Sequence, residues 1–328
     1  MNKKNTNFIE NLACPCCKGD LKILGKNKIK CLGSCKNSYD VEDGIPILLP
    51  KKLEAFKQLE ADYHTKESDN FTELNMKHSY RVAYYHKKYL QSFNNLNKKA
   101  LVVEVGGGDG LDALALLKKG FIVIQSDISI GMVKVAKKNT EVIARGQNAQ
   151  YVVCDAEQLP CKESSLDAIL IVAALHHLPS PQSFFNGAKR ALKPGGLIIV
   201  GFEPNRWPYF TVYPILRMIS KVMRLRKHFK HSETSVGDTE TEGFTRKDFQ
   251  NFTNEAGLEI VDLQRIWFLN GFIHTFFTSL NSKLSINSTI DLPLWLQKFL
   301  VFLDEILLKI PFMRNFCWHW TLVVKKTN

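Results

Sequence analysis

The sequence predicts a doubly wound α/β domain that carries a small metal-binding module at its amino-terminal side. From residue 100 onward, short apolar runs alternate with segments of helical periodicity, and a glycine-rich loop follows the first run. Apolar strands separated by amphipathic helices indicate a parallel sheet covered on both faces. Five of the eight cysteines fall within residues 14 to 35, which indicates the separate module.

The size and charge of the chain narrow the classes of partner. With 328 residues and 45% apolar composition, it can bury a large core without disulfides. The formal net charge of +12 favours anionic partners such as nucleic acid, an acidic membrane surface or a phosphorylated substrate. The start of the sequence lacks the apolar core of a signal peptide, so we expect the reducing cytosol. No uncharged apolar run reaches the roughly 18 residues of a membrane-spanning helix.

The cysteines of the amino-terminal module, residues 1–50, predict a zinc site. Cys14 and Cys17 form one pair and Cys31 and Cys35 a second, with room for a hairpin between them. Two such pairs can place four thiolates around one tetrahedral zinc ion, leaving no open position for catalysis. The adjacent surplus cysteine, at position 16, fits less well because a C-x-x-C pair suits a metal knuckle better than C-x-C. We expect a structural zinc that contributes folding energy to a module with little core of its own.

The stretches LACPCC, IKC and SYDVEDGIPILLP give this module a resemblance over about 40 residues. It is similar to the small zinc-ribbon proteins of the tRNA-methyltransferase activator family, whose members end in a comparable D-G-I-P-x-L-L stretch. In that family the module contacts a methyltransferase partner. The resemblance therefore implies a zinc ribbon beside a methyltransferase.

Residues 51–98 predict a polar linker followed by one packing helix. The stretch HSYRVAYYHKKYLQSF carries aromatic and apolar residues at spacings of three and four. We expect its tyrosine stripe to pack against the next domain, where part of it could cover a cofactor; the stripe consists of Tyr80, Tyr84, Tyr85 and Tyr89.

The large domain is predicted to span residues 99–328. Its strands are expected in ALVVEV, FIVIQSD, YVVCD, LDAILIVAAL and LIIVGFEP, with two more in LEIVDLQRIWF and CWHWTLVVKK. In doubly wound folds the ligand binds at the carboxyl ends of the strands, near the point where strand order reverses. Residues that directly follow the strands are therefore the candidates for the functional site.

The glycine-rich loop and the next acidic residue predict a nucleoside-containing ligand. Gly106, Gly108 and Gly110 lead into the first helix, where absent side chains would let a ligand approach the backbone amides. The loop alone is a weak signal, since Gly108 to Ala113 also fits a permissive dinucleotide-binding pattern. Asp127 ends the second strand, where a carboxylate can accept hydrogen bonds from the ribose hydroxyls of an adenosine. The alternative is that Asp127 caps the following helix.

Five ordered motifs give this domain a second resemblance. E-V-G-G-G-D-G, S-D-I-S-x-x-M, C-D-A-E-x-L-P, L-H-H-L and R-A-L-K-P-G-G follow one another over residues 100 to 205. They resemble the motifs of class I S-adenosylmethionine-dependent methyltransferases, particularly the small-molecule and lipid branch. The resemblance implies a Rossmann-like, seven-stranded methyltransferase sheet and S-adenosyl-L-methionine as the cofactor.

The same resemblance implies roles for individual residues. Glu104 would order the loop or bind the methionine amino group, and Asp127 would hold the ribose. Asp155 would accept a hydrogen bond from the adenine amine. Other contacts with the cofactor would come from the glycine loop and from Ile128, Met132, Ala156 and Ala173.

Methyl transfer depends mainly on proximity and orientation, so a dedicated base is optional. For a hydroxyl acceptor, His176 or His177 is the first candidate, because the pair follows the fourth strand. Glu203, at the end of the fifth strand, is the second candidate, either as a base or as a group that orients the acceptor. The alternative is that at least one histidine only packs or caps a helix.

Two helical insertions, at about 205–240 and 271–313, are predicted to cap the active site, since both leave from the carboxyl edge of the sheet. The first contains seven Lys or Arg between Asn205 and His231 and no acidic residue. It predicts a basic amphipathic helix suited to an anionic membrane, with an apolar face of Val212, Ile215, Leu216, Ile219, Val222 and Met223. Alternatively, these helices only pack on each other, or they hold RNA phosphates together with the zinc ribbon.

The sequence thus predicts a methyltransferase that is cytoplasmic or peripherally associated with the inner face of the membrane. It is expected to act on a hydrophobic or lipid-linked small molecule. RNA is the second candidate acceptor, because a zinc ribbon fused to a methyltransferase also resembles a group of ribosomal-RNA guanine methyltransferases. Against RNA, the aromatic residues lie in strongly apolar runs instead of alternating with basic residues. A third reading is a cofactor-binding scaffold that activates a partner without catalysis.

Overall fold

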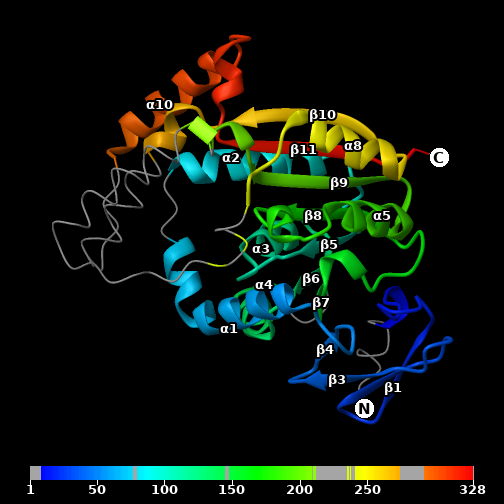
Figure 1. Ribbon diagram of the computed structural model, residues 1–328. Helices are drawn as coiled ribbons and strands as arrows, with labels where there is room; N and C mark the ends of the chain where they lie inside the picture. The colour runs from blue at the N-terminus through cyan, green and yellow to red at the C-terminus, as the bar shows by residue number, and fades with distance from the viewer. Residues whose placement is uncertain are drawn as a thin grey trace.

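The computed structural model describes residues 9–76, 80–144, 148–208, 210–211, 235, 237, 241–273 and 292–327. Its centre is one mixed sheet of eleven strands, in the order β1-β2-β3-β4-β7-β6-β5-β8-β9-β11-β10 (Figure 1). Strand order reverses beside β5, whose neighbours are β6 on one side and β8 on the other. The sequence predicts this kind of doubly wound core.

Seven strands make up the large domain. Five run parallel through β7-β6-β5-β8-β9, and β11 lies antiparallel between β9 and β10. All seven coincide with stretches that the sequence assigns to strands, although β7 and β9 begin two and five residues before their predicted stretches. The strands are β5 Leu101–Val105, β6 Ile122–Asp127, β7 Ala149–Cys154, β8 Leu166–Val172, β9 Leu192–Pro204, β10 Glu259–Ile266 and β11 His319–Lys325.

Helices cover both faces of this sheet, because alternate residues of each strand point to opposite sides. Val103 and Ile169 belong to the apolar cluster on one face, and Val102 and Leu170 belong to the cluster on the other. The helices and their bounds are α2 Tyr80–Leu90, α3 Leu111–Lys118, α4 Ile130–Ala144, α5 Pro181–Ala191, α8 Arg246–Ala256 and α10 Leu294–Leu307.

The amino-terminal module extends the same sheet instead of forming a separate body. Its strands are β1 Leu21–Leu24, β2 Lys28–Cys31, β3 Ser38–Glu42 and β4 Ile45–Leu48. The last of them pairs in parallel with β7, with Ile47 opposite Val153 and Leu48 opposite Cys154. The sheet therefore has more strands than the seven that the sequence predicted, because the module adds four strands to the β7 edge.

The predicted polar linker is wrong over most of its length, since helix α1 spans Ala55–Met76 and packs against α4. Its buried residues include Lys57, Glu60 and Ser68, which are polar. A helix that buries polar side chains has no apolar stripe in its sequence, and this explains why the periodicity of the segment did not predict it.

The two predicted insertions are only partly described. The basic amphipathic segment of the first lies outside the described residues, so its placement stays a prediction. From the second, residues 271–273 and 292–313 are described and include helix α10, and the short helix Met313–Phe316 follows it. Among the helices in the described ranges, none is both long and apolar enough to cross a membrane.

Candidate functional site

The loop between β5 and α3 packs tightly against its neighbours. Gly106 and Gly110 have φ values of 61° and 76°, in the region that favours glycine. A Cβ atom added at Gly106 would lie 2.7 Å from Cβ of Ala174, and one added at Gly110 would lie 2.8 Å from Cβ of Ala136. These glycines are therefore required by contacts within the protein, whereas the sequence suggested only the approach of a ligand.

Glu104, in β5, is a buried carboxylate with an unused acceptor. Its Oε1 accepts from the N–H of Ala113 at 3.1 Å, and its Oε2 has no hydrogen-bond partner among the described residues. Burial raises the pKa of Glu104 well above its ordinary value, and the nearby Asp112 and Asp109 raise it further. A cation bound here would offset this repulsion, so the site fits the ammonium group of a methionine-type cofactor.

The predicted tyrosine stripe of α2 lies beside this acidic cluster. Tyr85 and Tyr89 are buried, as the packing interpretation requires. The hydroxyl of Tyr89 donates to Asp112, and Nδ1 of His86 lies 3.2 Å from the same carboxylate. Helix α2 therefore covers the side of the loop that carries Glu104.

Asp127, at the end of β6, joins the glycine loop to α4. Its Oδ2 accepts from the N–H of Gly108 at 3.0 Å, and its Oδ1 accepts from the N–H of Ser129 at 2.9 Å. Burial raises its pKa, although these hydrogen bonds oppose the shift. Asp127 thus holds the backbone just before α4, whereas the cap itself is Ser129, whose hydroxyl accepts from the N–H of Met132 at 3.1 Å. The carboxylate oxygens can each accept a second hydrogen bond, so ribose binding remains compatible.

Asp155, at the end of β7, already has partners on both carboxylate oxygens. Nζ of Lys57, from α1, lies 2.8 Å from its Oδ2 and 2.6 Å from Oε2 of Glu157. Its Oδ1 accepts from the N–H of Glu157 at 2.9 Å, which starts the short helix Ala156–Gln158. The predicted contact with an adenine amine must therefore share Asp155 with Lys57.

The predicted apolar contacts of the cofactor differ in exposure. Met132 is fully buried among protein atoms, whereas Ile128 and Ala156 are only partly buried. Ala173 follows β8 with a φ of 49°, and its N–H donates to the carbonyl of Gly201. Ile128 and Ala156 thus retain surface for a ligand, and Met132 packs the protein beneath it.

Glu203 organises the turn that follows β8. Its carboxylate accepts from the N–H groups of Ala174, Leu175 and His176 at 2.8 to 3.1 Å, and its Oε2 lies 2.9 Å from Nδ1 of His176. Glu203 is fully buried. A carboxylate that is enclosed and saturated in this way suits a positioning role, which argues against the predicted role as a base.

His177 has a different partner from its neighbour. Its Nδ1 lies 2.8 Å from Oε2 of Glu60 in α1, and Nε2 of His64, one turn further along α1, lies 3.5 Å from the same oxygen. Burial alone would raise the pKa of Glu60, but the hydrogen bonds with His177, His64 and the N–H of Gly237 hold it well below its ordinary value. Glu60 is therefore ionised at neutral pH.

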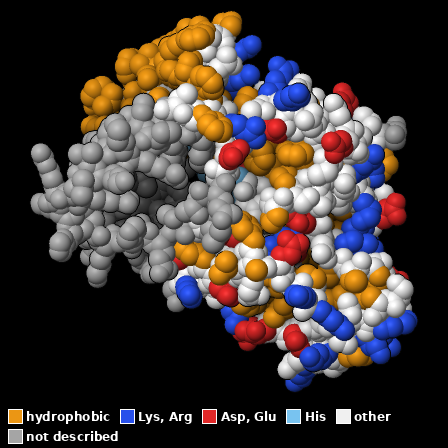
Figure 2. All heavy atoms as spheres, viewed as in Figure 1, with side chains coloured by type: hydrophobic (Ala, Val, Ile, Leu, Met, Phe, Trp, Pro, Cys, Tyr) orange, Lys and Arg blue, Asp and Glu red, His pale blue; other side chains and the backbone are white. Residues whose placement is uncertain are grey.

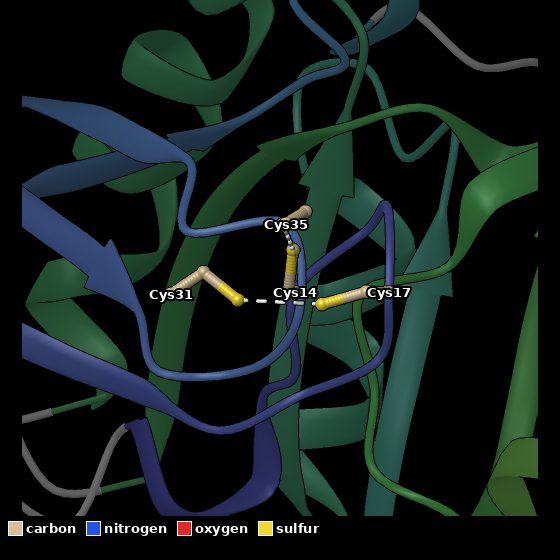
Figure 3. Close-up of side chains that lie close together, drawn as sticks. All are labelled: Cys14, Cys17, Cys31 and Cys35. Carbon is tan, nitrogen blue, oxygen red and sulfur yellow. Dashed lines mark hydrogen bonds between the residues drawn. The ribbon is translucent and has the colours of Figure 1, made fainter.

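The four predicted zinc ligands converge. Their sulfur atoms lie within 4.8 Å of one another, with 3.5 Å between Cys14 and Cys35 and 3.4 Å between Cys17 and Cys31 (Figure 3). Tetrahedral zinc with Zn–S bonds of about 2.3 Å would set sulfur–sulfur distances of about 3.8 Å. Backbone N–H groups of Cys35 and Gly19 lower the pKa of the Cys17 thiol to about 5, which favours the thiolate. The donor set therefore fits a structural zinc ion.

The carboxyl edge of the sheet thus brings together most of the predicted residues. The loop glycines, Glu104 and Asp127 lie around the β5 and β6 ends, and the histidines lie after β8. Sequence reasoning missed the contributions of α1, namely Lys57, Glu60 and His64. The spacing of Glu60 and His64, four residues apart on one helix face, was the available signal.

Comparison with known proteins agrees with this geometry. The family model described as a methyltransferase domain matches residues 103–200. The tRNA 5-carboxymethoxyuridine methyltransferase of Escherichia coli K12 is 31% identical over 106 residues, which cover 32% of this chain and 41% of that protein. The chain thus spans about two fifths of the length of that relative.

Two solved structures share the fold. A phosphoethanolamine N-methyltransferase 2 of Haemonchus contortus, in complex with S-adenosyl-L-methionine, has a TM-score of 0.55 at 16% identity, covering 86% of this chain and 62% of that one. A complex of the Haloferax volcanii Trm112 methyltransferase activator with a methyltransferase has a TM-score of 0.50 at 18% identity, covering 83% of this chain and 96% of that one.

A longer match decides the family. The ubiquinone/menaquinone biosynthesis C-methyltransferase UbiE of Rickettsia akari is 33% identical over 194 residues, which cover 55% of this chain and 75% of that protein. With this extent of similarity, and with the domain match over β5 to β9, the chain belongs to the methyltransferase-domain family of S-adenosylmethionine-dependent enzymes.

Proposed function

We propose that this protein transfers a methyl group from S-adenosyl-L-methionine to a hydrophobic or lipid-linked small molecule at the surface of an anionic membrane. When bound, the cofactor supplies an electrophilic methyl group. Glu104 would hold its ammonium group and Asp127 its ribose, with Ile128 and Ala156 beside the adenine. The first of these assignments is supported by the buried Oε2 of Glu104, which has no hydrogen-bond partner in the described part of the chain.

The observation that carries the acceptor class is the outward face of α10. Trp295, Phe299, Phe302 and Ile306 recur at helical spacing and are between 44% and 70% exposed. Ile310 and Phe312, which follow the helix, are exposed as well. Figure 2 shows these apolar side chains gathered over α10 at the upper left of the molecule. A contiguous apolar patch of this kind marks a surface that meets another apolar phase.

The charged residues on and beside α10 suit contact with an anionic surface. Both acidic residues of the helix are paired within the protein: Asp304 is buried and accepts from Asn270 and from backbone N–H groups, and Glu305 forms an ion pair with Lys88. Lys298 and Lys309 are exposed beside the apolar face. Cations flanking an apolar stripe are typical of helices that lie in a membrane interface.

We also propose that the amino-terminal module is a zinc ribbon that stabilises the methyltransferase domain within one chain. The convergence of Cys14, Cys17, Cys31 and Cys35 supports the metal, and the pairing of β4 with β7 supports the attachment. The Haloferax volcanii complex contains a methyltransferase and its activator, which supports the same association.

Flotation with anionic liposomes tests the membrane surface. The purified chain should float at low and moderate salt, and the double variant Phe299→Asp with Phe302→Asp should not. Leu32→Asp is the matched control, because Leu32 is also 50% exposed but lies in the amino-terminal module. Flotation that the double variant keeps would contradict the proposal. If the wild type does not float but self-associates, and the double variant alone loses that self-association, α10 is instead an interface between copies of the chain.

Transfer of a labelled methyl group tests the acceptor. The chain is incubated with methyl-labelled S-adenosyl-L-methionine and either total bacterial lipid or total bacterial RNA. We expect label in the organic phase of the lipid reaction. Label in precipitated RNA instead would overturn the lipid acceptor and favour RNA, the acceptor class named for the Escherichia coli relative.

A further inference from the structure

We propose that Glu60, His64 and His177 form a binding site for one divalent transition-metal ion, separate from the cysteine site. One donor atom from each residue lies within 4.8 Å of the other two. Oε2 of Glu60 is 2.8 Å from Nδ1 of His177 and 3.5 Å from Nε2 of His64.

These distances suit a metal of ordinary size. Bonds of about 2.0–2.1 Å from zinc to imidazole nitrogen or carboxylate oxygen place neighbouring ligand atoms of a tetrahedral site about 3.4 Å apart. Two imidazoles and one carboxylate match the preference of Zn²⁺, Fe²⁺ and similar ions, and they leave coordination positions open. The three residues therefore need only small side-chain movements to surround one ion.

The fold holds this cluster in place from three sides. Glu60 and His64 lie one turn apart on α1, and His177 belongs to the turn after β8, which Glu203 fixes through its backbone contacts. The remaining oxygen of Glu60 accepts from the N–H of Gly237 at 2.8 Å. A Cβ atom at Gly237 would lie 2.1 Å from Nδ1 of His177, so the backbone closes over the ring. Supporting contacts of this kind orient metal ligands.

The surrounding charges also permit a cation. Glu60 is 4% exposed, so its carboxylate is poorly solvated, and Asp127 is close enough to act electrostatically on His64. The adjacent His176 is held by Glu203. Lys57, three residues before Glu60 on α1, is engaged with Asp155 and Glu157, and Lys66, two residues after His64, is exposed to solvent. A divalent ion would thus neutralise negative charge at the cluster.

In the reaction, a metal ion at this site would activate a hydroxyl acceptor, and this role rests on the proposed function. A hydroxyl acceptor bound at an open position would lose its proton to solvent more readily, because the metal lowers its pKa. Its oxygen would then form a bond to the methyl carbon while the carbon–sulfur bond breaks and the cofactor leaves as a thioether. His177 would act as a metal ligand in this arrangement and not as a base.

Titration with Co²⁺ tests the metal site without cofactor or acceptor, so the result does not depend on the proposed function. The untagged full chain, with zinc retained in the cysteine site, should bind about one equivalent with visible ligand-field absorption. No thiolate charge-transfer band should appear with it. His64→Ala, at a side chain that is 25% exposed, and the near-isosteric Glu60→Gln should each weaken binding by at least about 10-fold.

His86→Ala is the matched control, because His86 also lies beside a carboxylate, that of Asp112. Among the described residues, no third ligand completes a metal site with this pair. It should bind Co²⁺ as the wild type does. Thermal unfolding of each variant identifies any loss that comes from misfolding. Absence of the ligand-field absorption in the folded wild type, or its persistence in both folded cluster variants, would overturn the proposal.

Discussion

Nζ of Lys57 lies 2.8 Å from Oδ2 of Asp155, and both side chains are at least 95% buried. This pair joins α1 to the carboxyl end of β7 across 98 residues of sequence. Glu157 accepts a second hydrogen bond from the same ammonium group. The cofactor edge of the sheet is therefore fastened to α1 by a buried ionic contact.

Replacing Lys57 with Met should destabilise the protein by about 3–5 kcal/mol, because it leaves two buried carboxylates without their cation. Urea unfolding at neutral pH measures the change. Lys28→Met is the control, since Lys28 pairs with Asp40 at the surface, where both side chains are more than half exposed. A surface pair contributes less than about 1 kcal/mol. Equal losses in the two variants would contradict the role of burial.

The effect of Lys57→Met should depend on pH in one direction. Burial alone would lower the pKa of Lys57, but the hydrogen bonds to Asp155 and Glu157 raise it above the ordinary value of 10.5. The folded state thus favours the charged form. The stabilising contribution is complete below pH 10.5 and is lost as the pH rises through the raised pKa. The stability difference between wild type and variant should be constant between about pH 7 and 9 and smaller at about pH 11.

Asp127→Ala should weaken binding of S-adenosyl-L-methionine by about 1.5–3 kcal/mol, roughly 10- to 150-fold, if Asp127 holds the ribose. Calorimetric titration measures the affinity. Because Asp127 also accepts from Gly108 and Ser129, thermal unfolding must show that the variant is folded. Asp167→Ala is the control: Asp167 likewise accepts from a backbone N–H, that of Leu101, but lies near the amino end of β8. Unchanged affinity in folded Asp127→Ala would place the ribose elsewhere.

The sequence predicted the central strands of the large domain because runs such as Leu101–Val105 are mostly apolar and are buried on both faces of the sheet. It could not predict the contacts of α1, whose inward residues are polar and find their partners about 100 positions away, as Lys57 does with Asp155. The pairing of β4 with β7 was equally hidden, since backbone hydrogen bonds leave no residue pattern of their own. In α10 the apolar periodicity predicted a helix but not its orientation, which places Trp295 and Phe302 outward.

The paired cysteines permit a test of the module that does not involve activity. Zinc retained after dialysis against a weak chelator should be about one per chain in the wild type. Cys31→Ser should lose it, because a hydroxyl is a poor replacement for a buried thiolate ligand. Cys16→Ser is the matched control, since Cys16 is exposed and adjacent to the predicted ligand Cys17 but is not one of the four converging sulfurs.

Loss of zinc should also affect the stability and the cofactor affinity of the large domain. Because β4 pairs with β7, and Asp155 directly follows the last residue of β7, unfolding of the module removes the edge partner of the strand that positions this predicted cofactor residue. Cys31→Ser should therefore lower the unfolding temperature of the whole chain and weaken S-adenosyl-L-methionine binding, whereas Cys16→Ser should change neither. Full zinc content in Cys31→Ser, or zinc loss without any effect on cofactor affinity, would show that the module and the methyltransferase domain are not coupled in this way.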